Sequence, residues 1–151
     1  MEPIHHYEVN LTWKTDRRGE ISAPGLPAII EVATPPEFPK GMAGIWSPEH
    51  LLVAAVNSCF MTTFLAIAEN SKLEFTSFLC TATGKLEKVE GKFLISEVVL
   101  SPVLTINNSE DAARALKVLH KSEAACLISN SIKSKIDFAP TIHTVESMVA
   151  R

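Results

Sequence analysis

The residue with the greatest potential for chemistry in this sequence is Cys59, which lies in the middle of the most apolar segment of the chain, residues 47–70. A free cysteine in such surroundings is usually an inert packing residue. It becomes a nucleophile only when a nearby cation or a helix N-terminus favours the thiolate over the thiol. Because no cationic residue lies near Cys59 within this segment, an activating arginine would have to come from elsewhere in the fold.

An acidic residue, Glu49, precedes Cys59 by 10 residues in the same segment. On one straight α-helix this separation corresponds to a rise of roughly 15 Å and an offset of about 80° around the axis. The two side chains therefore cannot meet along one helix. If they share a site, the helix breaks between them, a second subunit supplies one of them, or an arginine bridges the two. The polar pair Asn57 and Ser58 is the place where such a break could occur.

Three further residues could take part in cysteine chemistry. Arg17 and Arg18 are adjacent in a predicted turn, where an arginine is ordinarily a solvent-exposed residue. Cys126 lies 67 residues after Cys59 and, like Cys80, would ordinarily be a packing residue. If two of these thiols act together, they form a redox pair in a reducing compartment. We expect no metal site, because the sequence has no His and Cys spacing typical of zinc.

The first third of the chain predicts an antiparallel meander followed by a loop. Residues 6–13 alternate between apolar and polar side chains, which predicts a half-buried strand. A turn at 15–19 leads to a short extended stretch at 20–22, and residues 28–33 form a β-branched strand. Residues 34–45 are rich in proline and glycine, so we expect an irregular loop there, of a length at which loops are often functional.

A long helix is predicted after this loop. Ser47 is a favourable N-cap, Pro48 suits the first helical position, and Glu49 suits the positive end of the helix dipole. Because the segment is apolar on nearly all sides, we expect it to be enclosed by the fold. Residues 51–68 carry no charge over 18 positions, near the lower limit for a membrane span. Polar residues interrupt this stretch and no basic residues flank it, so a buried helix is the better interpretation.

The rest of the chain predicts a hairpin, two short helices and a strand. The β-rich runs 75–86 and 93–105 form the hairpin, helices follow at 110–120 and 123–131, and a strand at 133–145 bends near Pro140. The second helix carries Cys126. Because strands and helices are grouped rather than alternating, the predicted class is α+β. We expect antiparallel sheets packed around the long apolar helix, in a single domain spanning residues 1–151.

Composition and charge exclude several functional classes. The formal net charge is −3 and the basic residues do not cluster, so nucleic-acid binding is not expected. A count of 3 cysteines does not suit a secreted disulfide scaffold. The N-terminal residues 1–13 have neither the basic nor the apolar region of a secretory signal. We therefore expect a cytoplasmic protein that does not span a membrane.

Four motifs in register resemble one protein family. The sequence W-S-P-E-H-L-L-V-A-A-V-N-S-C-F, which ends just after Cys59, resembles the OsmC/Ohr family of osmotically inducible and organic hydroperoxide resistance proteins. That family carries a P-E-x-L motif and then an A-x-x-x-C-F-like stretch at the same spacing. A-A-C-L-I-S-N resembles the stretch around the family's second cysteine, and R-R-G-E-I-S, starting at Arg17, resembles its N-terminal arginine motif. The order of strands and helices also fits, so the resemblance covers essentially the whole chain.

The resemblance implies thiol peroxidase chemistry in oxidative stress defence. The Cys59 thiolate would attack the distal oxygen of an organic hydroperoxide and become a sulfenic acid. Cys126 would then condense with it to a disulfide, and an external dithiol or lipoyl-type reductant would restore both thiols. No bound cofactor or metal is implied.

The resemblance also implies how the rest of the site works. An arginine would favour the thiolate and the charge on the leaving oxygen, and Arg17 fits the R-x-G spacing better than Arg18. Glu49 would orient that guanidinium through a charge-assisted pair. An intertwined homodimer with its sites at the subunit interface would overcome the separation of Glu49 from Cys59 without a helix break. An apolar wall would favour organic peroxides over hydrogen peroxide; its residues would be Leu51, Leu52, Phe60, Met61 and Phe64.

The sequence departs from the family pattern at several positions. The family commonly has proline after its second cysteine, whereas this chain has Leu127. His50 replaces the glutamine or glutamate that often follows the acid, and Cys80 matches no family motif. The loop P-P-E-F-P-K-G-M-A-G-I-W is unlike the glycine-rich loop of the better-known branches. These departures indicate a less characterised OsmC-like subgroup.

Two other functions remain open from the sequence. In the first, the protein is a non-catalytic OsmC-like module that binds a hydrophobic ligand, and Cys59 is an unreactive wall residue of ordinary or raised pKa. In the second, Cys59 is the nucleophile of a hydrolase with a histidine as its base. The histidine candidates are His50, His120 and His143, but no local signature of such an enzyme is present.

Overall fold

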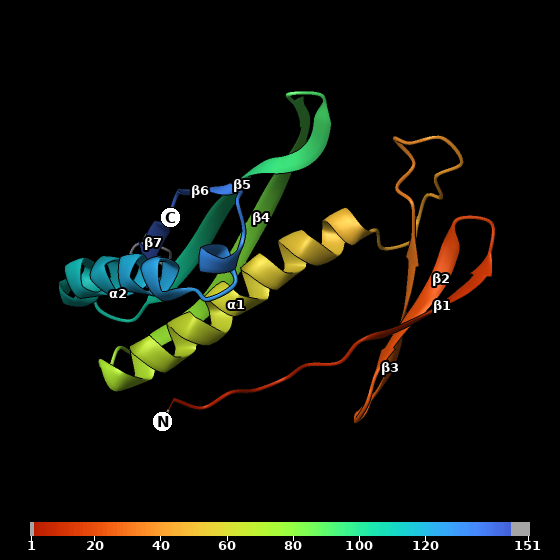
Figure 1. Cartoon of the computed structure of the whole chain (residues 1–151). Coiled ribbons are helices and arrows are strands. Elements are labelled where there is room, and N and C mark those ends of the chain that lie inside the picture. Colours follow the sequence, from red (N-terminus) through yellow and green to blue (C-terminus); the bar gives the residue numbers. More distant parts are fainter. Residues whose placement is uncertain (1, 146–151) are drawn as a thin grey trace. The chain divides into compact units, whose positions relative to one another are not determined.

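The computed structural model describes residues 2–145, which fall into two compact units, one up to residue 51 and one from residue 52 onward. Helix α1 (Pro48–Asn70) runs through the boundary between them (Figure 1). The expected organisation as a single domain stays a prediction.

The first unit contains a three-stranded antiparallel sheet in the order β1-β2-β3. Its strands are β1 (Asn10–Thr15), β2 (Arg18–Ala23) and β3 (Leu26–Ala33). The predicted meander is confirmed, although its first strand starts at Asn10 rather than at residue 6. The β1–β2 turn is tight because Asp16 takes a positive φ of 49° and its carbonyl accepts a 3.0 Å hydrogen bond from Trp13 Nε1. This turn places Arg17 at its tip.

Helix α1 begins with a reciprocal cap formed by Ser47 and His50. The backbone N–H of His50 donates to Ser47 Oγ at 3.2 Å, and the backbone N–H of Ser47 donates to His50 Nδ1 at 3.3 Å. This is a capping box in which histidine replaces the usual glutamate or glutamine three residues after the N-cap. The predicted N-cap is confirmed, and His50 has a structural task at the helix start.

The helix continues without a break through Asn57 and Ser58. Both side chains find partners that leave the helical backbone intact. Asn57 Nδ2 donates to the carbonyl oxygen of Cys80 at 2.9 Å, and Ser58 Oγ donates to the carbonyl oxygen of Ala54 at 2.7 Å. A helix break is therefore excluded as the way in which Glu49 and Cys59 could come together.

The second unit is built on a long hairpin of β4 (Phe75–Val89) and β5 (Lys92–Ile106), which pair antiparallel. The predicted final strand is split at Pro140 into β6 (Lys135–Phe138) and β7 (Thr141–Thr144). Both pair with β5 in parallel, a feature that the expected antiparallel sheets did not include. The split follows from Pro140, which has no N–H to donate, while the N–H of Ala139 donates to Leu100. The α+β class is confirmed.

One stripe of α1 forms the centre of the hydrophobic core. Its residues recur at every fourth position, and they are Val56, Phe60, Phe64 and Ala68. The ring of Phe64 stacks on Phe78 with centroids 4.7 Å apart. A Cβ atom on Gly84 would lie 2.5 Å from Val53 Cγ2, so the close approach of α1 to β4 depends on the missing side chain at position 84. These contacts fix the part of α1 that carries Cys59.

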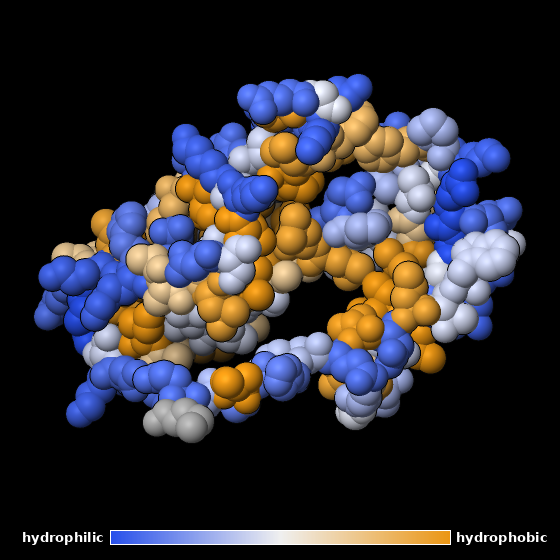
Figure 2. Space-filling model, in the orientation of Figure 1, coloured by the Kyte–Doolittle hydropathy of each residue, from blue (hydrophilic) through white to orange (hydrophobic). Residues whose placement is uncertain are grey.

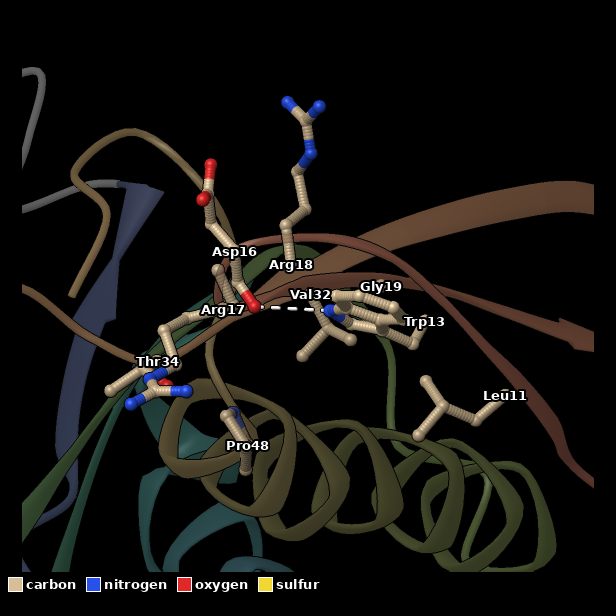
Figure 3. Close-up of a pocket in the computed structure, with 10 residues that line it drawn as sticks. Leu11, Trp13, Asp16, Arg17, Arg18, Gly19, Val32, Thr34 and Pro48 are labelled. Atoms are coloured by element: carbon tan, nitrogen blue, oxygen red, sulfur yellow. Dashed lines mark hydrogen bonds between the residues drawn. The ribbon is translucent and has the colours of Figure 1, made fainter. Parts of the chain in front are cut away.

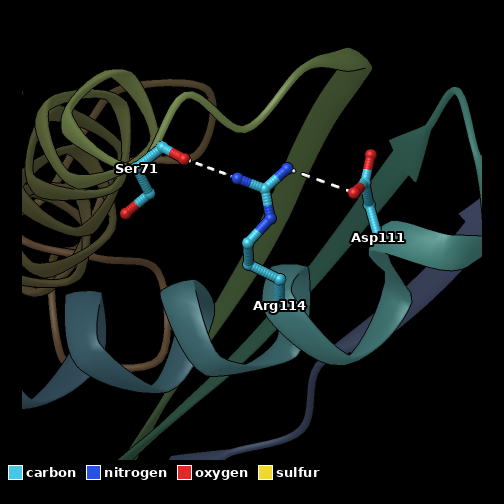
Figure 4. Close-up of polar contacts among 3 residues, drawn as sticks. All are labelled: Ser71, Asp111 and Arg114. Atoms are coloured by element: carbon cyan, nitrogen blue, oxygen red, sulfur yellow. Dashed lines mark hydrogen bonds and ion pairs between the residues drawn. The ribbon is translucent and has the colours of Figure 1, made fainter.

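The helical region before β6 differs from its prediction. The 3₁₀ turn η1 (Ser109–Asp111) leads into α2 (Ala112–Ala125), and a second 3₁₀ turn, η2 (Ser129–Ser131), follows. The predicted helix over 123–131 is wrong, because Cys126 ends α2 with an extended backbone of φ −65° and ψ 111°. Arg114 on α2 donates to the carbonyl oxygen of Ser71 and pairs with Asp111 at 3.1 Å (Figure 4). The bond to Ser71 ties α2 to the residue that follows α1.

Much apolar surface remains exposed in the single chain (Figure 2). Helix α1 is long and apolar enough to cross a bilayer by length and composition, yet its core stripe shows that packing against the sheet accounts for part of that apolarity. Another face of the helix is open, with Met61 40% and Leu65 42% exposed. The expected enclosure of α1 on nearly all sides therefore holds in the single chain only along the core stripe.

Candidate active site

Cys59 lies half-buried at the centre of α1 and faces the end of α2. Its Sγ is 4.0 Å from the hydroxyl of Thr63, one helical turn further on. On its other side are the thiol of Cys126 and the backbone of the two residues that follow Cys126. The structure thus brings together the two cysteines that the sequence separates by 67 residues. Both are free thiols.

The chain after Cys126 forms a compact turn. The backbone N–H of Asn130 donates to the carbonyl oxygen of Cys126 at 3.0 Å, and the hydroxyl of Ser131 donates to the carbonyl oxygen of Leu127 at 2.7 Å. Within such a turn the first N–H groups have no carbonyl partner of their own, as at the start of a helix. Here the N–H groups of Leu127 and Ile128 are directed at Cys59 Sγ.

The surroundings of Cys59 favour its thiolate. Burial by itself would raise the pKa of Cys59, but the N–H of Ile128, the Cys126 thiol, the Thr63 hydroxyl and the N–H of Leu127 all hydrogen-bond to the sulfur. Their combined effect holds the pKa of Cys59 below its ordinary value. The activation that seemed to require an arginine is therefore supplied in part by backbone donors.

The pKa of Cys126 shifts in the opposite direction. The side chain is fully buried, its Sγ lies 4.0 Å from the carbonyl oxygen of Val56, and burial raises its pKa. The neighbouring Cys59 raises it further, because a second thiolate beside the first is repelled, while Ser129 opposes the shift. Of this pair, Cys59 is therefore the thiol that ionises more readily, and Cys126 is the one that stays protonated to higher pH.

Cys80 is separate from this pair. It lies in β4 and packs against the hydrophobic core. Burial raises its pKa to about 11, so it stays a thiol at neutral pH. This agrees with the expectation that Cys80 is a packing residue.

The two arginines of the β1–β2 turn have different surroundings (Figure 3). Arg18 Nη1 lies 3.8 Å from Glu31 Oε1 on the neighbouring strand. Arg17 forms no ion pair within the described residues. Both arginines line a surface pocket of about 370 Å³. The wall of this pocket is largely apolar and includes Leu11, Trp13, Val32 and Pro48. Arg17 is therefore the arginine whose guanidinium is available for another partner.

Glu49 directly follows Pro48, which lines the same pocket as Arg17. It is half-buried and forms no ion pair among residues 2–145. The expected pair between Glu49 and an arginine is thus not made among these residues of the single chain. Because α1 is continuous, Glu49 also stays roughly 15 Å along the axis from Cys59.

The predicted apolar wall of the peroxide site needs correction. Phe60 and Phe64 are fully buried in the core, where both rings contact Phe78. They cannot line an entrance to Cys59. Of the other predicted wall residues, Met61 is exposed, whereas Leu51 and Leu52 are half-buried. An exposed apolar side chain that the prediction missed is Leu127, which is 65% exposed beside the cysteine pair.

Replacement of Leu127 by proline tests the backbone donors. Cys126 already has a backbone close to that of a residue before proline, so the turn should persist while one N–H donor to Cys59 is lost. The pKa of Cys59 then rises and its thiolate fraction at neutral pH falls. We expect the alkylation of Cys59 by iodoacetamide at pH 7 to slow about 10-fold, as for one hydrogen bond to a charged group.

The matched control for this change is Leu127→Ala, which removes the exposed side chain but keeps the N–H. It should react as the parent protein does. At a pH above both thiol pKa values, the proline variant should also react at the parent rate. An unchanged pH profile in the proline variant would show that the Leu127 N–H does not stabilise the thiolate.

A family model and curated proteins both match this chain. Residues 41–141 match the family model described as OsmC-like protein. The uncharacterized protein YmaD of Bacillus subtilis is 25% identical over 138 residues, which cover 88% of this chain and 90% of that protein. Peroxiredoxin OsmC of Escherichia coli is 28% identical over 90 residues, which cover 60% of this chain and 62% of that protein.

A solved structure shares the fold over nearly its whole length. The OsmC-like protein of unknown function from Vibrio cholerae superposes with a TM-score of 0.82 at 24% identity, covering 91% of this chain and 99% of that one. The family model spans the cysteine pair, α1 and the hairpin of β4 and β5. The chain therefore belongs to the OsmC-like protein family, as the motifs around Cys59 and Cys126 predicted.

Proposed function

We propose that this protein is a thiol-dependent peroxidase that reduces organic hydroperoxides, with Cys59 as the peroxidatic cysteine and Cys126 as the resolving cysteine. The observation that carries the proposal is the opposite pKa shift of two thiols in contact. A low-pKa sulfur beside a second, protonated sulfur is the arrangement that a two-cysteine peroxidase needs. The similarity to a protein named peroxiredoxin OsmC supports the same chemistry.

The proposed reaction balances without a bound cofactor or metal. The Cys59 thiolate attacks the distal oxygen of the hydroperoxide, the O–O bond breaks, and the alkoxide leaves as the alcohol after taking up a proton. Cys126 then loses its proton and attacks the sulfur of the Cys59 sulfenic acid. The S–O bond breaks, hydroxide leaves as water, and the disulfide forms. An external dithiol of lipoyl or similar type reduces this disulfide by thiol exchange.

Arg17 is proposed as the cation of the complete site. Its guanidinium has no ion-pair partner within the described residues, and the residue lines a pocket with largely apolar walls. Such a group would stabilise the negative charge on the departing oxygen. Glu49, which is also unpaired among the described residues, would hold the guanidinium in place through a charge-assisted hydrogen bond. Arg18 is the weaker candidate because Glu31 already holds it.

We also propose that two copies of the chain form an intertwined homodimer. In the first unit Leu11, Trp13 and Ile29 are 68%, 73% and 62% exposed, although a small sheet needs a covered apolar face for stability. The open face of α1 around Met61 and Leu65 is a second exposed apolar surface, and such surfaces often mark interfaces. A second copy would cover such surfaces and could complete each site. A reducing cytoplasm, without membrane or nucleic-acid partners, is the proposed setting.

The lowered pKa of Cys59 favours a peroxidase over the two alternatives. A non-catalytic binding module would leave this thiol at an ordinary or raised pKa. A hydrolase would need a histidine base at the cysteine. His50 is held by Ser47, and the ring of His120 packs edge-on against Phe138.

The proposal is tested by titrating thiols before and after oxidation. Reduced protein treated with 1 equivalent of cumene hydroperoxide should lose two titratable thiols per chain, and peptide mapping should find a disulfide between Cys59 and Cys126. Cys80 should remain free. Retention of all the thiols after excess peroxide would rule out the proposed function. Loss of Cys59 alone would rule out the resolving role of Cys126.

A further inference from the structure

The hydroxyl of Ser129 is a buried polar group that meets no N or O acceptor among the described residues and faces the sulfur of Cys126. Ser129 is 8% exposed, and its Oγ makes no hydrogen bond of normal geometry within the described residues. Burial of a hydroxyl without a good acceptor lowers the free energy of unfolding. A buried serine in this position therefore indicates a role other than stability. The other two polar side chains of this stretch are satisfied: Asn130 Nδ2 donates to Ala124 and the Ser131 hydroxyl donates to Leu127.

The fold places Ser129 against Cys126. It lies three residues after Cys126, at the start of η2, and the bond from the N–H of Asn130 to the Cys126 carbonyl closes the turn around it. Both the N–H and the hydroxyl of Ser129 face Cys126 Sγ. Cys126 Sγ is therefore the acceptor that the Ser129 hydroxyl faces, and the sulfur becomes a stronger acceptor once it carries a negative charge.

Stabilisation of a Cys126 thiolate matters at the step that forms the disulfide. The sulfur is fully buried and sits beside Cys59, and both conditions disfavour its ionisation. The attack on the Cys59 sulfenic acid requires the Cys126 thiolate, because the thiol is a poor nucleophile. In that step the S–H bond of Cys126 and the S–O bond of Cys59 break, the S–S bond forms, and water leaves. After the first oxidation Cys59 no longer carries a charge, so its repulsion of a Cys126 thiolate is gone.

We propose that Ser129 is a positioning residue for disulfide formation, whose hydroxyl and backbone N–H hold the Cys126 sulfur as the attacking thiolate. The proposal rests on the proposed function, since it assigns a task in the resolving step. Ser129 takes no part in the first step, because the groups around Cys59 Sγ are Thr63, Cys126 and the N–H groups of Leu127 and Ile128.

The test separates the two steps in the full-length protein. Ser129→Ala is compared with Ser131→Ala, a matched control in the same turn whose hydroxyl serves Leu127 instead. Reduced protein is mixed with cumene hydroperoxide, dimedone trapping reports the sulfenic acid, and mass mapping reports the disulfide. For Ser129→Ala we expect the first step at the parent rate and the second step slowed about 10-fold at pH 7, as for one hydrogen bond to a charged group.

The pH profile distinguishes this role from a purely structural one. Loss of the hydroxyl raises the pKa of Cys126, so the second step in Ser129→Ala should reach its midpoint at higher pH and regain the parent rate under alkaline conditions. Ser129→Thr, which keeps a hydroxyl, should restore the parent midpoint, and Ser131→Ala should not move it. Ser129→Gly serves as a second variant without a hydroxyl if the alanine variant does not fold.

The possible outcomes separate this inference from the proposed function. Normal oxidation of Cys59 followed by an unshifted second step in Ser129→Ala would overturn the role of Ser129 alone. A Cys59 that does not react with the hydroperoxide in any variant would overturn the proposed function, and the role of Ser129 with it. A midpoint that shifts equally in Ser131→Ala would show a general loosening of the turn and would also overturn the role of Ser129.

Discussion

Replacement of Cys59 by serine is expected to abolish the reduction of organic hydroperoxides, with a fall in kcat/KM of about 10³-fold or more. The reaction needs a sulfur that is ionised at neutral pH and can form a sulfenic acid, and serine offers neither property. The donors directed at position 59 would remain, but they would have no nucleophile to stabilise. The measurement is the consumption of cumene hydroperoxide with a dithiol as the reductant.

Cys80→Ser is the matched control for this prediction. Cys80 is a free thiol of raised pKa that packs against the core, away from the Cys59 pair. Its replacement should leave turnover unchanged, apart from a modest effect on stability. If Cys59→Ser kept the parent activity while Cys80→Ser lost it, the assignment of the peroxidatic cysteine would be wrong.

The second large effect is expected at Arg17. Its replacement by alanine should lower kcat/KM by about 10²-fold, which is typical for the loss of one group that stabilises a developing negative charge. Arg18→Ala should lower it far less, because Arg18 pairs with Glu31 in a half-exposed ion pair of little energetic value. The two variants remove the same charge from neighbouring positions, so they are a matched pair. Equal losses in both would indicate a general electrostatic effect rather than a specific role of Arg17.

Mixing two variants of low activity tests whether two chains complete each site. A heterodimer of Arg17→Ala and Cys59→Ser chains contains one intact arginine and one intact cysteine, each on a different chain. If the arginine acts on the cysteine of the other chain, one of the two sites is whole, and activity should return on mixing and subunit exchange. If both residues act within one chain, the mixture should show no more activity than the two variants show separately.

The sequence predicted where α1 begins and how its side chains are spaced along the helix. Ser47 and Pro48 predicted the start of α1, and the helix begins there. The spacing of Glu49 and Cys59 correctly indicated that the two cannot meet along one helix. The contact between Cys59 and Cys126 followed from the family motifs rather than from periodicity, since nothing local in the sequence connects two residues 67 positions apart.

The backbone N–H groups that lower the pKa of Cys59 could not be predicted in the same way. The N–H groups of Leu127 and Ile128 carry no side-chain signature, and their direction depends on the turn that ends α2 at Cys126. The only sequence signal was the leucine at position 127 where the family commonly has proline, since a proline has no N–H. The apolarity of α1 on most sides also concealed that Phe60 and Phe64 belong to the core stripe, although their spacing of four residues was visible.

The pH dependence of Cys59 oxidation tests the central claim most directly. Stopped-flow measurement of the reaction between reduced protein and cumene hydroperoxide gives the second-order rate constant at each pH. Because the donors around Cys59 lower its pKa, the rate should rise and reach its plateau at lower pH than for an ordinary cysteine thiol. A rate that rises only at or above the pH range of an ordinary thiol would contradict the account, as would a reaction no faster than that of a free cysteine.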